Sequence, residues 1–182
     1  MLEVNSLDVV VDGKVLLRDL SFIVELGQSW AILGANGTGK SSLLRLLSGI
    51  TKPAEDDVFV EDVALSSFSQ KSLAKEVGLL PQFEDHNYWG SVSEYVGLGR
   101  FAHAAGLFGQ SENDQLITKK SLENFEIGNL SHREYRGLSG GERQRTRLAS
   151  LMAQDPRIFL WDEPLENLDY SGQMKFLSWL VG

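Results

Sequence analysis

Apolar and polar residues alternate along residues 2–26, as they do in strands with one buried face. The pair Asp12-Gly13 interrupts the alternation and is typical of a tight hairpin turn. We therefore predict an antiparallel sheet at the N-terminus. The next run, residues 29–33, is mostly apolar and is bounded by Gly27 and Gly34, which predicts a buried strand beside that sheet.

Further along the chain, short apolar runs alternate with stretches of helical periodicity. The elements expected are strands at 58–60, 77–80 and 158–161, and helices after residue 40, at 70–76 and at 172–180. Between residue 83 and about residue 150 the spacing is helical, with an exposed loop expected at 106–113. This alternation predicts a fold of the α/β class.

Length and composition narrow the classes of function. The chain has 182 residues, enough for one domain with a sizeable core. A net charge of -8 disfavours binding to a phosphate backbone, so no nucleic-acid partner is expected. The chain has no cysteine, which excludes disulfides and thiolate metal sites. No apolar run approaches the ~18 residues of a membrane span, and the first residues lack the features of a signal peptide, so we expect any membrane role to act through a partner.

A glycine-rich segment follows the run at 29–33 and matches the phosphate-binding pattern G-x-x-x-x-G-K-[ST]. It consists of Gly34, Ala35, Asn36, Gly37, Thr38, Gly39, Lys40 and Ser41. In such a loop Lys40 would meet the β- and γ-phosphates of a nucleotide, and the Ser41 hydroxyl would help hold Mg²⁺. The alternative is a glycine-rich turn that only caps a helix.

Two acidic residues, Asp162 and Glu163, end the apolar run at 158–161. A carboxylate at that place can hold the waters of Mg²⁺, and the next can take a proton from an attacking water. An acidic turn, or a helix start stabilised by negative charge, would give the same pattern.

The segment around Ser139 offers a third signal. Ser139 and Glu142 form an S-x-x-E capping box for a helix. The intervening Gly140 and Gly141 are not needed for a cap, but they suit a backbone pressed against a phosphate. The two interpretations are compatible.

Together with Gln82 after a strand, these motifs resemble the ATP-binding cassette (ABC) ATPases in order and spacing. The resemblance covers nearly the whole chain. Residues 34–42, including Ser42, resemble the Walker A loop, Gln82 the Q-loop glutamine, 139–144 the signature, 158–163 Walker B, and 168–169 the end of the D-loop.

The resemblance implies a P-loop NTPase fold with a RecA-like core, an antiparallel β-subdomain and an inserted α-helical subdomain. The implied nucleotide-binding domain occupies residues 1–182 without the family's usual C-terminal end. Residues 1–82 and 151–182 would form the core and β-subdomain, and residues 83–150 the helical subdomain with the signature.

In function, the resemblance implies an ATPase that binds ATP and Mg²⁺. Ser41, Gln82 and Asp162 would serve the metal, Glu163 would polarise water, and Gln82 would couple the site to a transmembrane partner. Family members work as head-to-tail dimers, so Ser139, Gly140 and Gly141 would close over ATP held by a second subunit. An integral-membrane permease would hold the pair at the cytoplasmic face of the cell membrane.

Residues 93–103, 106–109 and 130–133 resemble the group of importers for iron-siderophore, haem or cobalamin substrates. An ordinary amphipathic helix with solvated His and Arg would also explain them. Two other functions stay open. One is a soluble ABC protein that clamps DNA, ribosomes or a cluster-assembly partner, and the other is a truncated copy that binds ATP with little turnover.

The sequence departs from the family pattern in several places. Val11 stands where an aromatic ring usually stacks on adenine, which predicts weaker ATP affinity or looser base selectivity. The family's switch histidine would follow beyond the last residue, so we expect a shortened gene product or a member with impaired turnover. His86, His103 and His132 cannot fill that role by position, and residues 165–167 differ from the common D-loop start.

Tyr88 and Trp89 lie just past Gln82, near the place where the family docks its permease. We expect either a docking contact or packing in the core.

Overall fold

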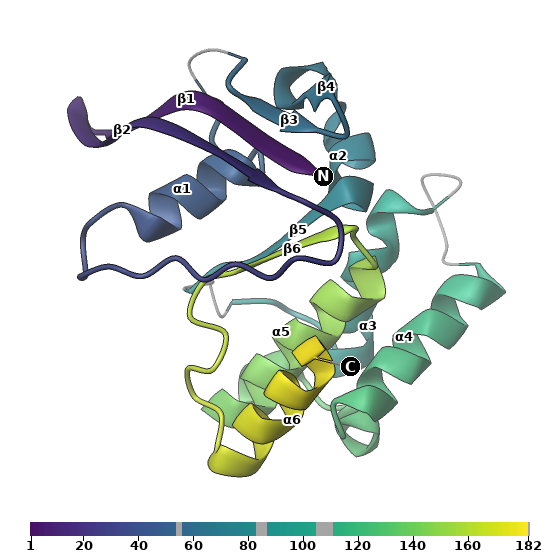
Figure 1. Ribbon diagram of the computed structural model, residues 1–182. Coiled ribbons are helices and arrows are strands. Elements are labelled where there is room, and N and C mark those ends of the chain that lie inside the picture. The colour runs from purple at the N-terminus through teal and green to yellow at the C-terminus, as the bar shows by residue number, and fades with distance from the viewer. Residues whose placement is uncertain (54–55, 83–86, 105–110, 182) are drawn as a thin grey trace. The chain divides into compact units, whose positions relative to one another are not determined.

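The computed structural model describes residues 1–53, 56–82, 87–104 and 111–181 (Figure 1). His86 and loop residues 106–110 lie outside the described residues. The chain divides into two compact units, and each is treated by itself below. The first contains residues 1–79 and 157–162, and the second contains residues 80–156 and 163–182.

The first unit is built around an antiparallel sheet in the order β2-β1-β3-β4. Its strands are β1 (Leu2–Val11), β2 (Lys14–Val24), β3 (Val58–Val60) and β4 (Val63–Ala64). Asp12 and Gly13 have positive φ values of 50° and 76°, as a tight turn between twisted strands requires. The predicted N-terminal antiparallel sheet is confirmed.

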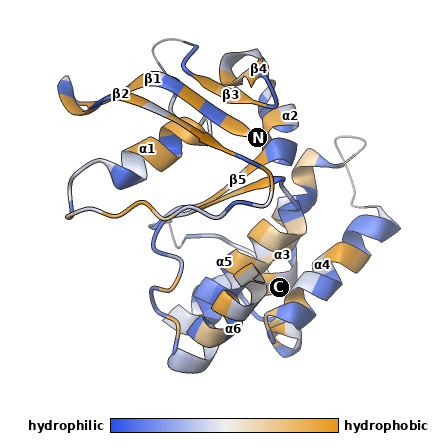
Figure 2. Ribbon diagram, viewed as in Figure 1, coloured by the Kyte–Doolittle hydropathy of each residue, from blue (hydrophilic) through white to orange (hydrophobic). Residues whose placement is uncertain are grey.

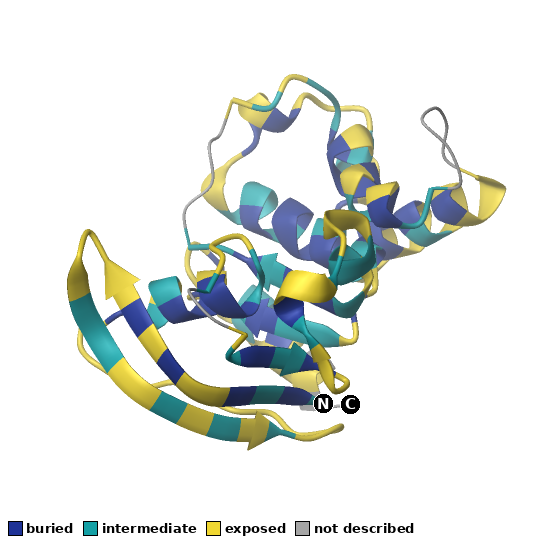
Figure 3. Cartoon of the chain, turned by 90° about the horizontal axis from the view of Figure 1, so that it is seen from above, coloured by how far each residue is buried: buried dark blue, intermediate teal, exposed yellow. Residues whose placement is uncertain are grey.

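Buried residues recur along β1, whereas β2 has only intermediate and exposed residues (Figure 3). The buried side chains of β1 pack with the leucines of α1 (Lys40–Leu47) in one apolar core. Its members include Leu2, Val4, Leu7, Val9, Leu43, Leu44, Leu46, Leu47, Val58 and Val60. This core fixes the helix that follows the glycine-rich loop.

The remaining elements of the first unit are short. They are η1 (Leu65–Ser67), α2 (Gln70–Glu76), β5 (Val77–Leu80) and β6 (Ile158–Trp161). β5 and β6 form a separate two-stranded sheet. The strands expected at 77–80 and 158–161 and the helix at 70–76 are therefore confirmed.

The buried strand predicted at residues 29–33 is wrong. These residues belong to neither sheet, and Trp30, Ile32 and Leu33 are exposed, Leu33 to 91%. An apolar run becomes a strand only where a neighbour supplies backbone hydrogen bonds. Among the described strands, β5 and β6 pair with each other and leave this segment out of the ladder.

The second unit is helical. It contains α3 (Val92–Gly97), α4 (Glu112–Asn124), α5 (Gly140–Gln154) and α6 (Tyr170–Val181), with short 3₁₀ turns η2 (Leu98–Ala102), η3 (Gly128–Leu130) and η4 (Tyr135–Gly137). The loop predicted from the sequence extends to residue 113, but α4 already begins at Glu112, so the predicted C-terminal end of the loop is wrong. The cause is a capping box between Ser111 and Asp114, which starts the helix there.

α5 is the central helix of this unit and contacts α3, α4 and η2. An apolar core surrounds it, in which the rings of Tyr95 and Tyr135 stack at 4.2 Å between centroids. α4 carries both hydrophilic and hydrophobic residues (Figure 2), and its buried positions are mostly polar: Asp114, Thr118, Ser121 and Leu122. In the part of the chain that is described, no helix is both long and apolar enough to cross a membrane.

Candidate functional site

The glycine-rich loop lies in the first unit and curls around the side chain of Lys40. The Lys40 ammonium donates to the carbonyl oxygens of Gly34 and Ala35, both at 2.9 Å. The Thr38 hydroxyl donates to the Ala35 carbonyl, also at 2.9 Å. The first two bonds hold the ammonium of Lys40, the first residue of α1, against the backbone of the loop.

Backbone conformation and lack of space explain why glycine occupies positions 34 and 39 of this loop. Gly39 is the N-cap of α1 with φ 101°, and a Cβ atom there would lie 3.2 Å from Cβ of Leu16. A Cβ atom on Gly34 would lie 3.0 Å from the Thr38 hydroxyl oxygen. A bare, curled backbone at a helix N-terminus with a lysine inside fits the phosphates of a nucleotide.

Asp162 and Ser41 also belong to the first unit. Asp162 follows β6 directly and is buried, whereas Ser41 is exposed on the first turn of α1. Both present oxygen atoms, the ligands that Mg²⁺ prefers. Among the described residues there is no cluster of three or more His, Asp or Glu side chains that could enclose a metal. This donor set fits an ion that takes its other ligands from phosphates and water.

Gln82 and Glu163 meet in the second unit. The Gln82 side-chain amide donates to Oε2 of Glu163 at 2.9 Å, although the two residues lie 81 positions apart. Glu163 has φ 51°, a left-handed conformation that is uncommon for a residue with a side chain. Such strain often accompanies functional positions. The carboxylate can accept a proton from water.

Two polar residues of α5 hold the backbone next to this pair: Arg147, which sequence reasoning missed, and Gln144, which it assigned only to the signature. Arg147 donates to the Pro81 carbonyl, and Gln144 donates to the Pro164 carbonyl at 2.8 Å. Both side chains are buried. The available signal was their spacing, because they lie on the same helical face as Leu148 and Leu151, where apolar residues are expected.

The capping box predicted at the start of α5 is confirmed. The Ser139 N–H donates to Glu142 Oε2 at 2.8 Å, and the Glu142 N–H donates to the Ser139 hydroxyl at 3.3 Å. Hydrogen bonds from the backbone N–H of Ser139, and next from its side chain, lower the pKa of the Glu142 carboxyl. The helix end carrying Gly140 and Gly141 is thus formed by local contacts.

The adjacent glycines also have a reason within the chain. A Cβ atom on Gly141 would lie 3.2 Å from the carbonyl oxygen of Asn167, and one on Gly140 would lie 3.6 Å from its Cβ. The close approach of Asn167 is thus one reason for glycine at positions 140 and 141, and the predicted contact with a phosphate is a second.

The predicted site residues fall into two groups, one in each unit. The first unit holds the loop residues, including Ser42, together with Asp162. The second holds Gln82, Glu163, Ser139, Gly140 and Gly141.

Tyr88 and Trp89 have different surroundings. Tyr88 packs edge-on against Tyr95 and Tyr135, with centroid distances of 5.3 and 5.9 Å. Trp89 is 77% exposed, and the Arg136 guanidinium lies 3.3 Å from its ring centroid. Packing in the core explains Tyr88, whereas Trp89 presents an exposed cation–π pair.

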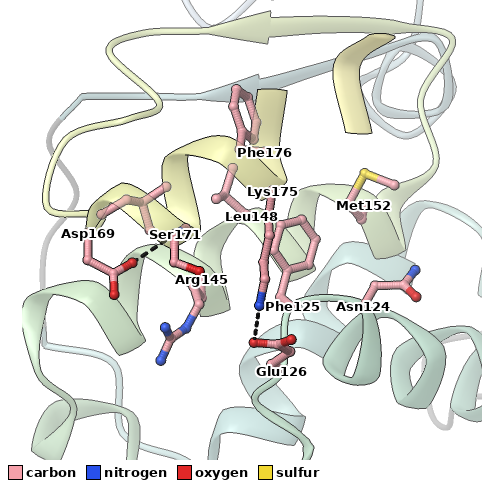
Figure 4. A pocket seen from close by; sticks show the side chains of 12 residues that line it. Asn124, Phe125, Glu126, Arg145, Leu148, Met152, Asp169, Ser171, Lys175 and Phe176 are labelled. Atoms are coloured by element: carbon pink, nitrogen blue, oxygen red, sulfur yellow. Dashed lines mark hydrogen bonds and ion pairs between the residues drawn. The ribbon is translucent and has the colours of Figure 1, made fainter. Parts of the chain in front are cut away.

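A cavity of about 170 Å³ lies in the second unit, lined by residues of α4, α5 and α6 (Figure 4). The ammonium of Lys175 forms a 2.6 Å ion pair with Glu126 at its wall. None of the residues predicted to bind ATP lines this cavity.

The phosphate loop, the paired glutamine and glutamate, and the capped glycine-rich helix together define a P-loop nucleotide-binding protein. The family model for ABC transporters matches residues 17–166. The chain belongs to the ABC transporter family, and the predicted P-loop ABC ATPase fold is confirmed.

Several relatives are named as ATP-binding subunits of importers. The chain is 32% identical to the iron(3+)-hydroxamate import ATP-binding protein FhuC of Bacillus subtilis, over 98% of this chain and 66% of that protein. It is 37% identical to the hemin import ATP-binding protein HmuV of Pseudomonas fluorescens, over 93% and 67%. The chain thus spans about two thirds of the length of these relatives.

Solved structures agree on the fold. A metal-chelate type ABC transporter in an inward-facing conformation matches with a TM-score of 0.80 and 30% identity, over 99% of this chain and 66% of that chain. The dimeric ATP-binding cassette MJ0796, bound to ADP and phosphate, matches with a TM-score of 0.83 at 22% identity, over 100% and 81%.

Proposed function

We propose that this chain is the ATP-binding and ATP-hydrolysing subunit of a membrane importer for iron-siderophore, haem or cobalamin-type substrates. The observation that carries the proposal is the glycine-rich loop curled around Lys40, which a phosphate chain fits. The substrate class rests on the names of its relatives, which import iron(3+)-hydroxamate, petrobactin and hemin.

In this function the loop residues bind the phosphates of ATP. Lys40 exchanges its two carbonyl partners for phosphate oxygens, and Ser41 and Ser42 add hydroxyl groups at the helix N-terminus. Ser41, Gln82 and Asp162 would hold Mg²⁺, which neutralises phosphate charge when it is bound. Glu163 accepts the proton of the attacking water, and this role contributes about 10²- to 10⁴-fold in rate.

The partners proposed are a second ABC subunit, arranged head to tail, and an integral-membrane permease. Ser139, Gly140 and Gly141 at the start of α5 would close over the ATP of the other subunit. The permease would place the complex at the cytoplasmic face of the cell membrane. The exposed Trp89 and Arg136 offer the permease a contact of the aromatic and arginine type that is enriched in interface hot spots.

Nucleotide binding and steady-state hydrolysis test the enzymatic part. Wild type should bind ATP and release phosphate, Lys40→Ala should lose binding, and Glu163→Gln should keep binding but lose turnover. Equal turnover in wild type and Glu163→Gln would contradict the role of Glu163. If wild type binds ATP without turnover, the result would favour the alternative of a truncated copy that binds ATP with little turnover.

Copurification tests the transport part. Association with an integral-membrane permease supports an importer, whereas a soluble partner alone would favour the non-transport alternative. Because permease capture does not depend on turnover, the two parts of the proposal can fail separately.

A further inference from the structure

Two buried side chains of α5 connect the backbone beside Gln82 to the backbone beside Glu163. Arg147 donates to the carbonyl of Pro81 through Nη2 and to Oε1 of Gln144 through Nη1, the latter at 2.8 Å. Gln144 donates in turn to the carbonyl of Pro164 at 2.8 Å. Pro81 and Pro164 are the direct neighbours of Gln82 and Glu163.

The hydrogen bond from Gln82 to Glu163 closes these contacts into a ring. Four hydrogen bonds form it: Arg147 to Pro81, Arg147 to Gln144, Gln144 to Pro164, and Gln82 to Glu163. All six residues belong to the second unit. The ring is therefore a property of one compact body.

The ring places a charge where an apolar side chain would cost less. Arg147 is 7% exposed and Gln144 is 4% exposed. A buried cation is costly unless hydrogen bonds compensate it, and a hydrophobic residue of similar volume is often neutral or stabilising in its place. Leu148 and Leu151 on the same helix show that this face accepts apolar residues. Packing alone therefore does not account for Arg147.

The two contacts on the proline carbonyls restrain the backbone at Pro81 and Pro164. A proline has no N–H group, so its carbonyl is the only backbone group by which it can be held. Holding the carbonyls of Pro81 and Pro164 restrains the chain on both sides of the amide–carboxylate pair. It also supports the left-handed backbone of Glu163.

We propose that Arg147 is a positioning residue for ATP hydrolysis, acting with Gln144 to set the placement of Glu163 against Gln82. This inference rests on the proposed ATPase function. Because Ser139 is the N-cap of α5, the helix that carries the signature is bonded to the backbone next to the proposed general base. A displacement of α5 would thus move the Glu163 carboxylate.

Kinetics of three variants test the role. Arg147→Met removes the donors but keeps much of the volume, and we expect kcat to fall about tenfold to a hundredfold, because small misplacements of reacting groups have effects of that size. KM for ATP should stay within about twofold, since the phosphate loop is unchanged. Arg147→Lys should recover part of kcat through a bond to the Pro81 carbonyl. Arg145→Met removes the same charge from the same helix, outside the ring, and should behave as wild type.

A second measurement does not need turnover. The side-chain amide resonance of Gln82, assigned by its loss in Gln82→Leu, reports the bond to Glu163 by NMR of the nucleotide-free protein. It should move in Glu163→Ala, move toward the same position in Arg147→Met, and stay in place in Arg145→Met. A wild-type resonance in Arg147→Met would overturn the positioning role.

The two measurements separate this inference from the proposed function. If wild type hydrolyses no ATP, the proposed activity fails, and the Gln82 resonance still decides whether Arg147 positions the pair. If Arg147→Met does not fold, as judged by circular dichroism, Arg147→Lys and Gln144→Leu are used in its place. A wild-type resonance in folded Gln144→Leu would equally overturn the ring.

Discussion

The guanidinium of Arg100 forms an ion pair with the carboxylate of Asp114 at 2.9 Å, and both side chains are almost fully buried. Arg100 also donates to the carbonyl of Ala153 at 2.7 Å, near the end of α5. Asp114 is the capping-box acid of α4. Arg100 of η2 thus connects the start of α4, through the ion pair, with the end of α5, through the hydrogen bond to Ala153.

Removing Arg100 should therefore destabilise the helical unit. Arg100→Met leaves the Asp114 carboxylate buried without its cation, and breaking a buried pair from one side costs about 3–5 kcal/mol. Urea unfolding followed by circular dichroism measures this loss. Arg133→Met, which breaks an exposed pair with Glu142, is the control and should cost below about 1 kcal/mol. Equal losses would contradict the prediction.

The same carboxylate should make stability depend on pH. Hydrogen bonds from the Ser111 hydroxyl and from Arg100 lower the pKa of Asp114 from 3.8 to about 2. Because the pKa is lower in the folded state, the stabilisation is complete above the unfolded pKa and is lost as the pH falls toward 2. The difference in melting temperature between wild type and Asp114→Asn should shrink as the pH falls from about 5 to about 2, because the Asp114 carboxylate becomes protonated over this range. A constant difference would argue against the lowered pKa.

Gly39 should be intolerant of a side chain. Gly39→Ala forces an alanine to φ 101° and brings its methyl group against Leu16, so we expect a loss of about 1–3 kcal/mol in stability and weaker ATP binding. Gly27→Ala is the matched control, because Gly27 also has a positive φ but no atom lies within 4 Å of the place that a methyl group would take. It should share the strain and keep the ATP affinity, measured by calorimetry.

Val11 should limit ATP affinity. Val11→Tyr supplies a ring at the position where the family resemblance places an adenine-stacking residue, and base stacking is worth about 1–3 kcal/mol, which corresponds to about fivefold to 150-fold in the dissociation constant. Calorimetry with ATP measures it. Val10→Tyr adds the same ring on the preceding residue of β1, whose side chain points to the opposite face of the strand, and it should leave the ATP affinity unchanged. Unchanged affinity in Val11→Tyr would refute the stacking hypothesis.

Trp89 should contribute to the contact with the permease. Trp89→Ala removes an exposed anchor and its cation–π contact, and it should reduce copurification of the permease about tenfold or more, as interface hot spots do. Phe101→Ala removes another exposed aromatic ring of the same unit and should not. Equal copurification of the two variants would show that Trp89 is not an anchor.

The helix starts and the phosphate loop could be predicted because their causes are local. Ser139 and Glu142 lie three residues apart, and the loop carries its glycines and Lys40 in one segment. Contacts between distant segments gave no such signal. The resemblance singled out Gln82 and Glu163 but not the bond between them, and the bonds of Arg147 depend on how α5 packs.

The strand predicted at 29–33 failed for the same reason. Composition describes whether a segment suits a sheet, but a ladder also needs a neighbouring strand. The described sheets supply none, although the apolar run itself is as expected.

That segment has a consequence for the behaviour of the chain in solution. Residues 29–33 combine β-branched, aromatic and aliphatic side chains with no charge and no proline, and they lie open on the surface. Segments of this kind recruit one another into intermolecular sheets. We expect the chain by itself to self-associate as its concentration rises, and a charged residue at Leu33 to slow that aggregation.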